Sequence, residues 1–279
     1  MTTTHTHAML LTAVAPGRWT TFAGPEWRNP GGGLWGGYAI GLCVRVLEAE
    51  PDAVGEALSL TLTYAAALPA GDLDIATRRL RQGGSIGVWE VEVSSAGSGE
   101  VGVHAIVTMA RRPKTPDFAF ATMPQAPAPE SLSSPEVASP DVPGEALHFG
   151  ASAFERRTLD TFPPQPGGSS LTLAWVRSRR GPLDKALLGM ITDNSAPRAM
   201  YALGPVVNTT TLSLTVYLHA TVEEIAEVGD DFILVECEGR VGGHGASDER
   251  SSYWRRDGKL LATSEQLAWY RERRREVAE

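Results

Sequence analysis

Two polar side chains in this sequence lie among small or apolar neighbours. Gln266 shares one face of a strand-like run with residues that are mostly small: Leu260, Ala262, Ser264, Ala268 and Tyr270. Asp193 lies inside an apolar region with helical character, residues 182–203. A buried amide must find a polar partner, and burial raises the pKa of a carboxyl group toward the range of a general base. Asp193 can be such a base, or it can cap the helical turn that begins near Pro197.

Other motifs with catalytic associations fit their surroundings less well. Residues 83–87 read Gly-Gly-Ser-Ile-Gly, which matches the G-x-S-x-G pattern of serine hydrolases, but Ser85 leads into a strand-like alternation and is predicted to be a turn residue. The glycines at 31, 33 and 36 match G-x-G-x-x-G, yet no strand precedes them, so a dinucleotide site is not expected. His5 and His7 have no cysteine or carboxylate nearby, and we expect a surface segment there without a metal.

The chain carries one layout twice, in residues 71–111 and 229–271. A Gly-Asp turn, an Arg-x-Gly-Gly turn, a hairpin tip and a closing arginine follow one another at separations of 10, 18 and 12 residues in the first copy and 11, 18 and 13 in the second. Similar strands precede the two copies, LSLTLTY and TLSLTVY. The repeat predicts two similar halves. Counting five residues back from the closing arginine gives Gln266 in the second copy but Ile106 in the first, so we expect one polar site per chain.

Apolar periodicity predicts the elements that position these groups. A glycine-rich loop leads into a helix that begins near Gly36 and ends before Pro51. Strands are expected at residues 58–68, 73–81, 86–93 and 101–110, in the order of a meander, and in the second half near 149–158 and at 171–177. The Pro-, Ala- and Ser-rich residues 113–144 predict an extended linker, which Phe118 and Phe120 hold to the surface. The predicted organisation is residues 1–112, a linker of 113–144, and residues 145–279.

Composition excludes several classes of partner. The 279 residues carry a net charge of −8, which leaves no basic stripe to replace phosphate counterions, so nucleic acid is not expected. The basic residues at 271–275 predict a solvated tail, with a phosphate-binding patch as the alternative. No apolar run approaches the roughly 20 residues that span a bilayer, and the N-terminus lacks a charged signal-peptide start. Cys43 and Cys237 lie in apolar stretches, so we expect a cytoplasmic protein with no disulfide and no membrane partner.

Several stretches together resemble the acyl-CoA thioesterase II family. These are the LWGGY loop at residues 34–38, the run AWVRSRRGPLDKALLGMITD that ends at Asp193, the strand TTLSLTVYLH and the ending DGKLLATSEQLAWYR. The resemblance implies an α+β double hotdog fold, in which each of two tandem units wraps an antiparallel sheet around a central helix. It also implies a catalytic trio, matched here by Asp193, Thr211 and Gln266, with Thr210 as the neighbouring candidate. The sequence departs from the family at Ser213-Leu214, where Asp-His is common, and at Trp35, where the family has Phe.

The chemistry of such a trio is water activation. Hydrolysis of a thioester needs an oriented water, a group that takes its proton and donors for the oxyanion. Asp193 can take the proton, and Thr211 and Gln266 can hold the water. We expect a substrate-binding surface that includes the following residues: Trp35, Gly36, Gly37, Gly83, Gly84, Gly242 and Gly243. The amides of Gly36 and Gly37 are candidate oxyanion donors.

The expected substrate is an acyl-CoA or another acyl thioester, with no metal or other cofactor. A non-catalytic acyl-thioester-binding protein and a hotdog hydratase or dehydratase remain as alternatives. The last of these needs a histidine near the helical region, and His148, His219 and His244 are not placed for that role. The exposed sheet faces predict a homodimer or a higher homo-oligomer.

Overall fold

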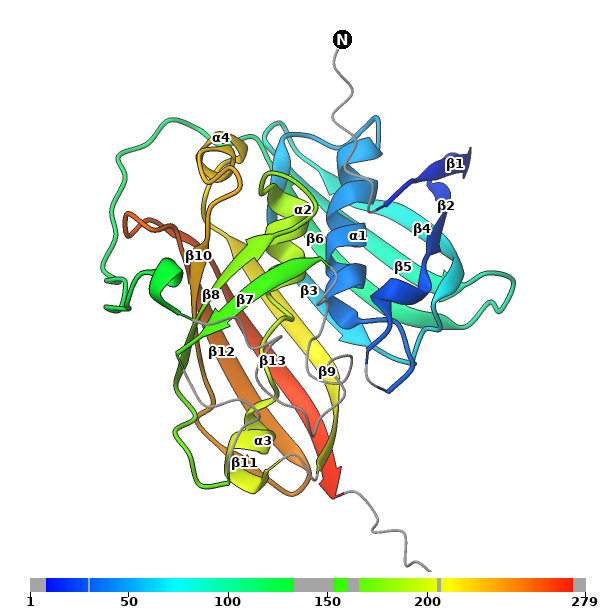
Figure 1. Cartoon of the computed structure of the whole chain (residues 1–279). Coiled ribbons are helices and arrows are strands. Elements are labelled where there is room, and N and C mark those ends of the chain that lie inside the picture. Colours follow the sequence, from blue (N-terminus) through cyan, green and yellow to red (C-terminus); the bar gives the residue numbers. More distant parts are fainter. Residues whose placement is uncertain (1–8, 30, 133–152, 160–165, 205–206, 273–279) are drawn as a thin grey trace, which may run out of the picture.

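One antiparallel sheet curves around two helices that lie side by side on its concave face (Figure 1). The structure is a computed structural model and describes residues 9–29, 31–132, 153–159, 166–204 and 207–272. His5 and His7, His148 and most of the basic cluster at 271–275 lie outside these residues. Among the described residues, no helix has the length and apolar character needed to span a membrane.

The N-terminal half supplies the first helix and half of the sheet. Its elements are β1 (Thr12–Ala15), β2 (Arg18–Ala23), the 3₁₀ helix η1 (Pro25–Trp27), α1 (Gly36–Ala49), β3 (Glu56–Tyr64), β4 (Gly71–Gln82), β5 (Ile86–Ser95) and β6 (Val101–Ala110). The predicted helix is confirmed as α1, which is apolar over most of its length and almost entirely buried. Ser85 lies in the turn between β4 and β5, as expected for a turn residue and not for a hydrolase nucleophile.

The C-terminal half repeats this plan with its helical region divided in two. Its elements are η2 (Pro129–Ser131), β7 (Phe154–Thr158), β8 (Thr172–Ser178), α2 (Lys185–Ile191), α3 (Arg198–Leu203), β9 (Val207–Leu218), α4 (Val222–Ala226), β10 (Ile233–Glu238), β11 (Gly242–Gly243), β12 (Ala246–Trp254) and β13 (Leu260–Glu272). The break between α2 and α3 comes before Pro197, and a residue that precedes proline is disfavoured in helical conformation. Asp193 falls in this break.

The strand order is β1-β2-β4-β5-β6-β3-β9-β13-β12-β10-β8-β7, with β11 beside β12. The pair of β3 and β9 joins the halves into one continuous sheet, as expected for tandem units. The predicted meander is wrong for β3, which pairs with β6 and not with β4. The six residues that connect β3 to β4 can span roughly 20 Å, which exceeds the roughly 14 Å across three strand spacings. A short connection therefore does not force the two strands to pair.

The structure confirms the internal repeat but corrects one correspondence. The β3–β6 register shifts at Leu58 and the β9–β13 register shifts at Leu212, so each half has a β-bulge at the corresponding place. Matching these bulges makes Val107, which is fully buried, the counterpart of Gln266. The predicted counterpart, Ile106, is wrong by one residue because the extra residue of the second copy lies between Gln266 and the closing arginine. Valine, like isoleucine, offers no polar group, so the expected single site stands.

The segment after β6 is held to the C-terminal half by residues other than those expected. Residues 111–128 form no regular secondary structure. Phe118 and Phe120 are 82% and 95% exposed, so they do not hold the segment to the surface. Met123, Ala126 and Leu132 pack instead against a small apolar cluster: Trp175, Phe232, Leu234 and Trp254. Residues 133–152 lie outside the described residues, and the domain boundaries remain a prediction.

Candidate active site

Asp193, Thr211 and Gln266 lie together where the α2–α3 break meets strands β9 and β13. The Gln266 Nε2 donates a hydrogen bond to the Thr211 Oγ1 at 2.6 Å. The Gln266 side chain also lies close enough to the Asp193 carboxylate to lower its pKa. The structure therefore brings the three predicted residues into one connected group.

The bulge at Leu212 turns Thr211 toward this group. In β9, Leu214 lies on the buried face of the sheet. Strict alternation would place Leu212 on this buried face too, and Thr211 on the exposed face. The extra residue reverses this order, so that Thr211 pairs with Ala268, which is buried. Thr210, the neighbouring candidate, is exposed. The geometry selects Thr211 and not Thr210.

The turn that carries Asp193 is fixed through its own backbone. Pro197 begins α3 without any side-chain cap, so the interpretation of Asp193 as a helix cap is wrong. Side chains from several elements donate instead to the carbonyl oxygens of the turn. These are Tyr253 to Thr192 O (3.2 Å), Trp35 to Asp193 O (3.0 Å), Arg156 to Asn194 O (2.8 Å) and Arg198 to Ala196 O (3.1 Å). Such support holds the carboxylate in one place before any substrate arrives.

The N-terminus of α1, which belongs to the other half of the chain, closes the site. A Cβ atom on Gly36 would lie 2.9 Å from the Asp193 Oδ2 and 3.1 Å from the Tyr64 ring, so only glycine fits without displacement. The Gly37 amide lies close enough to the Asp193 carboxylate to lower its pKa. The Tyr64 hydroxyl donates to the Gly36 carbonyl oxygen at 3.1 Å. Gly36 thus allows close approach, and the group that approaches is the carboxylate of Asp193.

The surroundings of Asp193 raise its pKa to about 7. The first cause is burial, which removes water from the charged form, and the second is the negative charge of Glu249. The nearby Gly37 amide and Gln266 side chain act in the opposite direction, because polar donors favour the charged form. A carboxyl group with this pKa is partly ionised at neutral pH, and it can take up and release a proton there.

The other predicted substrate-binding residues do not all reach this site. Trp35 is 1% exposed and stacks on Trp27 with ring centroids 6.4 Å apart, so it supports the Asp193 turn from inside the core. The pair Gly83 and Gly84 lies exposed between β4 and β5, separated from β9 by β6 and β3. The pair 242–243 forms the exposed strand β11. Substrate binding by these two glycine pairs remains a prediction.

Sequence reasoning missed a buried carboxylate beside the trio. Glu249 in β12 pairs directly with Gln266 in β13 and is 7% exposed. Its partner is Arg198, which is 4% exposed, with Nε to Oε2 at 3.3 Å. The alternation of Ser247, Glu249, Ser251 and Tyr253 in β12 was a usable signal, because it places a charged residue on the same strand face as a tyrosine.

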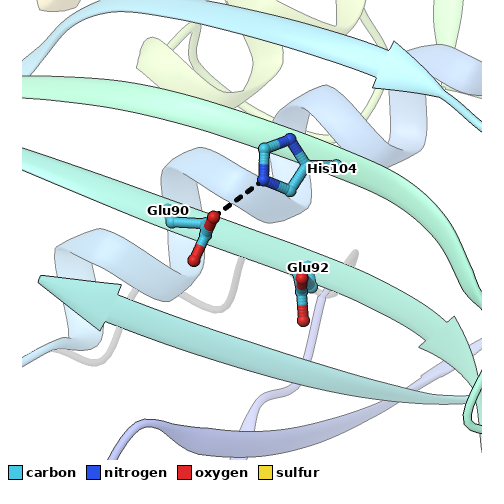
Figure 2. Close-up of side chains that lie close together, drawn as sticks. All are labelled: Glu90, Glu92 and His104. Atoms are coloured by element: carbon cyan, nitrogen blue, oxygen red, sulfur yellow. Dashed lines mark hydrogen bonds and ion pairs between the residues drawn. The ribbon is translucent and has the colours of Figure 1, made fainter. Parts of the chain in front are cut away.

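One group of possible metal ligands occurs among the described residues, and it lies away from the trio. Glu90 and Glu92 in β5 and His104 in β6 have ligand atoms within 4.8 Å of one another. Figure 2 shows His104 turned toward Glu90, with its Nε2 2.9 Å from the Glu90 Oε1. Arg78 forms an ion pair with the same Glu90 carboxylate at 2.6 Å. The guanidinium already neutralises this carboxylate, so we assign the group to surface hydrogen bonding.

Comparison with known proteins agrees with the architecture. Two tandem units around one continuous sheet, with a polar cluster at their junction, define a double hotdog protein. Models of the acyl-CoA thioesterase N-terminal domain and C-terminal domain match residues 24–110 and 122–270. The chain belongs to the acyl-CoA thioesterase family, which confirms the resemblance seen in the sequence.

Solved structures show the same fold at low sequence identity. A protein of unknown function with a hot dog fold from Alicyclobacillus acidocaldarius is 24% identical, with a TM-score of 0.85 over 94% of this chain and 96% of that one. The acyl-CoA thioesterase II TesB2 from Mycobacterium marinum is 17% identical, with a TM-score of 0.69 over 95% and 96%. A comparison with proteins of curated function gave no match. The predicted double hotdog fold is confirmed.

Proposed function

We propose that this protein hydrolyses acyl-CoA thioesters to a free acid and CoA, with Asp193 as the general base. The observation that carries the proposal is the connected group of Asp193, Thr211 and Gln266 at the N-terminus of α1. This group combines a carboxyl group of pKa about 7 with a hydroxyl and an amide that can orient a water. Such a set is sufficient for attack on an electrophilic thioester carbonyl.

The first step is attack by water. The Asp193 carboxylate takes one proton of the water while its oxygen bonds to the thioester carbon, and the carbonyl oxygen becomes an oxyanion. Gln266 and Thr211 fix the water by hydrogen bonds. The amides of Gly36 and Gly37, at the start of α1, are the proposed donors for the oxyanion. The Gly37 amide lies close enough to Asp193 to lower its pKa, so a carbonyl bound beside Asp193 would lie within reach of it.

The second step breaks the carbon–sulfur bond. The oxyanion reforms the carbonyl, the sulfur leaves with the bonding electrons, and Asp193 returns its proton to the thiolate. A thiol has an ordinary pKa of about 8.5, so transfer from an acid of pKa about 7 runs downhill. The carboxyl group is then ionised again and ready for the next water. The proposed chemistry uses neither a metal nor another cofactor.

The alternative of a hydratase or dehydratase finds no support in the described histidines. His104 lies in the surface group on β5 and β6, and His219 bonds Thr263 on an exposed edge. His244 is exposed beside β11. None of these three side chains belongs to the group around Asp193. The binding-protein alternative predicts the same fold without turnover, so activity separates it from our proposal.

The decisive experiment is release of free thiol from a panel of acyl-CoA thioesters of different chain length. The Asp193→Asn variant keeps the side-chain shape and removes the base, and we expect its kcat to fall about 100-fold or more. The matched control is Asp257→Asn, which changes an exposed aspartate in the β12–β13 hairpin and should keep the parent rate. An Asp193→Asn variant with parent activity, or no turnover of any acyl-CoA by the parent, would move the assignment to the binding protein.

Association of chains belongs to the same proposal. We expect a homodimer or a higher homo-oligomer of a cytoplasmic enzyme, because the outer faces of β9 and β13 expose Tyr217, Leu267 and Trp269. Sedimentation equilibrium of the purified protein measures this directly, and a monomer at micromolar concentration would contradict it.

A further inference from the structure

A second carboxylate lies beside the trio without entering the proposed chemistry. Glu249 and Gln266 are directly opposite in the β12–β13 pair, so their side chains lie next to each other on the concave face of the sheet. Glu249 is 7% exposed, and an uncompensated charge at this depth would be strongly disfavoured. A carboxylate at this position therefore needs a partner of opposite charge.

Arg198 is that partner, and hydrogen-bond acceptors and an aromatic ring surround its side chain. Its Nη1 donates to the Ser170 carbonyl and to the Thr172 hydroxyl, both at 2.9 Å, and its Nε donates to the Ala196 carbonyl at 3.1 Å. Its guanidinium lies 4.3 Å from the centre of the Tyr201 ring. A Cβ atom on Gly239 would approach the stem of Arg198 to 2.8 Å, so a glycine leaves the room for it.

Arg198 also connects the ion pair to the catalytic turn. It is the first residue of α3, and through the Ala196 carbonyl it holds the end of the turn that begins at Thr192 and carries Asp193. Glu249 contacts the other side of the group through its neighbour Gln266. The ion pair is therefore linked to two residues of the trio, Gln266 and Asp193, without being part of the trio itself.

We propose that the buried pair of Glu249 and Arg198 is the positioning unit of this site, in which Glu249 supports Gln266 and Arg198 fixes the turn that bears Asp193. This inference rests on the proposed hydrolase function and extends it to two residues that touch neither water nor substrate. It predicts that the pair sets both the geometry of the trio and the charge that Asp193 experiences.

The charges that face this region come from several elements. Tyr64 on β3 has a pKa raised well above its usual value by burial, and burial raises the pKa of Cys43 on α1 and Cys237 on β10 to about 12. These three groups are neutral across the working pH range. Glu249 on β12 opposes ionisation of Asp193, while Arg198 and, on β7, Arg156 lie close enough to act on Glu249. Loss of the Glu249 charge should therefore lower the pKa of Asp193. Loss of Arg198 should act in the same direction, because burial raises the pKa of Glu249, Arg198 opposes that rise, and without Arg198 the Glu249 carboxyl group takes up a proton.

The test is the pH dependence of kcat/KM in three variants. Glu249→Gln removes a negative charge at nearly constant shape, so the acid limb should move to lower pH, by on the order of one unit, with a lower plateau because a less basic carboxylate is a weaker base. Arg198→Met removes the charge that keeps the buried Glu249 ionised, so Glu249 should take up a proton and the acid limb should again move to lower pH. Arg198→Lys keeps the charge but loses the forked contacts, so the limb should stay and kcat should fall. A merely structural role would lower kcat in all three variants without moving the limb.

Controls and a second readout complete the design. Glu238→Gln removes a half-buried carboxylate that pairs with Arg250 on the same sheet and should leave the limb unchanged. The pKa of the Asp193 carboxyl group is measured directly by ¹³C NMR with labelled aspartate, and the Asp193→Asn spectrum assigns the signal. If Arg198→Met does not fold, Glu249→Gln and Arg198→Lys still decide the question.

The outcomes separate the two proposals. An acid limb and an Asp193 titration that do not move in Glu249→Gln would overturn the positioning unit while leaving the hydrolase intact. A parent protein that cleaves no acyl thioester would overturn the hydrolase, and the NMR titration alone would then decide whether the pair controls Asp193.

Discussion

The folded protein favours the neutral form of the Asp193 carboxyl group over its charged form. Its carboxyl group titrates near 3.9 in an unfolded chain and at about 7 in the folded protein. Between these pH values the folded state binds more protons than the unfolded state, so this group lowers folding stability as the pH rises, and the penalty is complete above pH 7. Catalytic competence at Asp193 therefore comes with a cost in stability.

The Asp193→Asn variant should reveal that cost. Because asparagine carries no charge, we expect the free energy of unfolding at pH 8 to exceed that of the parent by about 1–3 kcal/mol, while the two proteins should be equal near pH 4. Urea denaturation at both pH values measures the difference. A variant that is less stable than its parent at pH 8 would show that the carboxylate is well solvated and that its pKa is not raised.

Thr211 and Gln266 act as one unit, since the amide of one donates to the hydroxyl of the other at 2.6 Å. Thr211→Val and Gln266→Leu should each lower kcat by about 10-fold, and the double variant should lose less than the product of the two effects because they hold one water. Thr210→Val is the matched control and should keep the parent rate, since that side chain is exposed. Strict multiplicativity in the kinetic cycle would argue against a shared water.

At the scale of residues, the sequence could single out three side chains that the structure brings together, because they stand out locally or match a family pattern. It could not identify Glu249, which interacts with Gln266 across a strand pair whose register no local pattern reveals. It also could not show that Trp35 is buried support for the Asp193 turn, because burial depends on the packing of Trp27 and Phe154 around it.

At the scale of elements, the start of α1 must lie close to Asp193, and this constrains Gly36. A Cβ atom at this position would press on the carboxylate at 2.9 Å. We expect Gly36→Ala to lower kcat/KM about 10-fold or more, since sub-ångström displacement of catalytic groups is costly. Helix stability should not fall, because alanine is the better helix former. Thermal denaturation and thiol release on the same samples measure both effects.

Gly84→Ala provides the comparison. Nothing lies within 4 Å of a Cβ atom at this exposed position, so the change should leave KM and kcat at parent values. A raised KM would instead support the prediction that this glycine pair touches substrate.

Helices and strands were largely predictable, but their arrangement was not. Apolar periodicity located α1 and strands β4 to β6 because it records which residues share a buried face. It carries no information on which strand neighbours which, so the placement of β3 beside β6 and β9 came only with the structure. The bulge at Leu212 was equally hidden, since a single extra residue looks like ordinary alternation until the partner strand is known.

At the scale of the whole molecule, the position in the N-terminal half that is equivalent to the Asp193 site holds different residues. Lys185 is the first residue of α2, as Gly36 is of α1. Its ammonium group is buried and donates to the carbonyl of Ala57, the counterpart of Thr211, at 2.8 Å. It also pairs with Glu56 at 2.8 Å. An ion pair thus fills the place that corresponds to the active site.

Loss of this ion pair should affect stability and not turnover. We expect Lys185→Met to lower the free energy of unfolding by on the order of 3 kcal/mol, because the largely buried Glu56 would keep only Arg112 and the Val222 amide as partners. The kcat of the folded fraction should not change. Lys259→Met removes a partly exposed partner of Glu224, so it should cost less than about 1 kcal/mol.

A companion variant, Val107→Gln, installs an amide at the position that corresponds to Gln266. It should not create a second site, because the counterpart of Asp193 is a valine in α1 and Lys185 occupies the space. Doubled turnover per chain would show that this end is not closed to catalysis.

The ion pair at the silent end has a consequence for how such a chain can change over generations. In a duplicated ancestor with two identical sites, the same residues at each site would have had both to catalyse the reaction and to stabilise the contact between the halves. In the function that we propose, one end carries the reactive groups and the other joins the two halves. Selection would then act on the residues around Lys185 only through stability and on those around Asp193 through turnover, so the two copies of one ancestral motif could diverge independently.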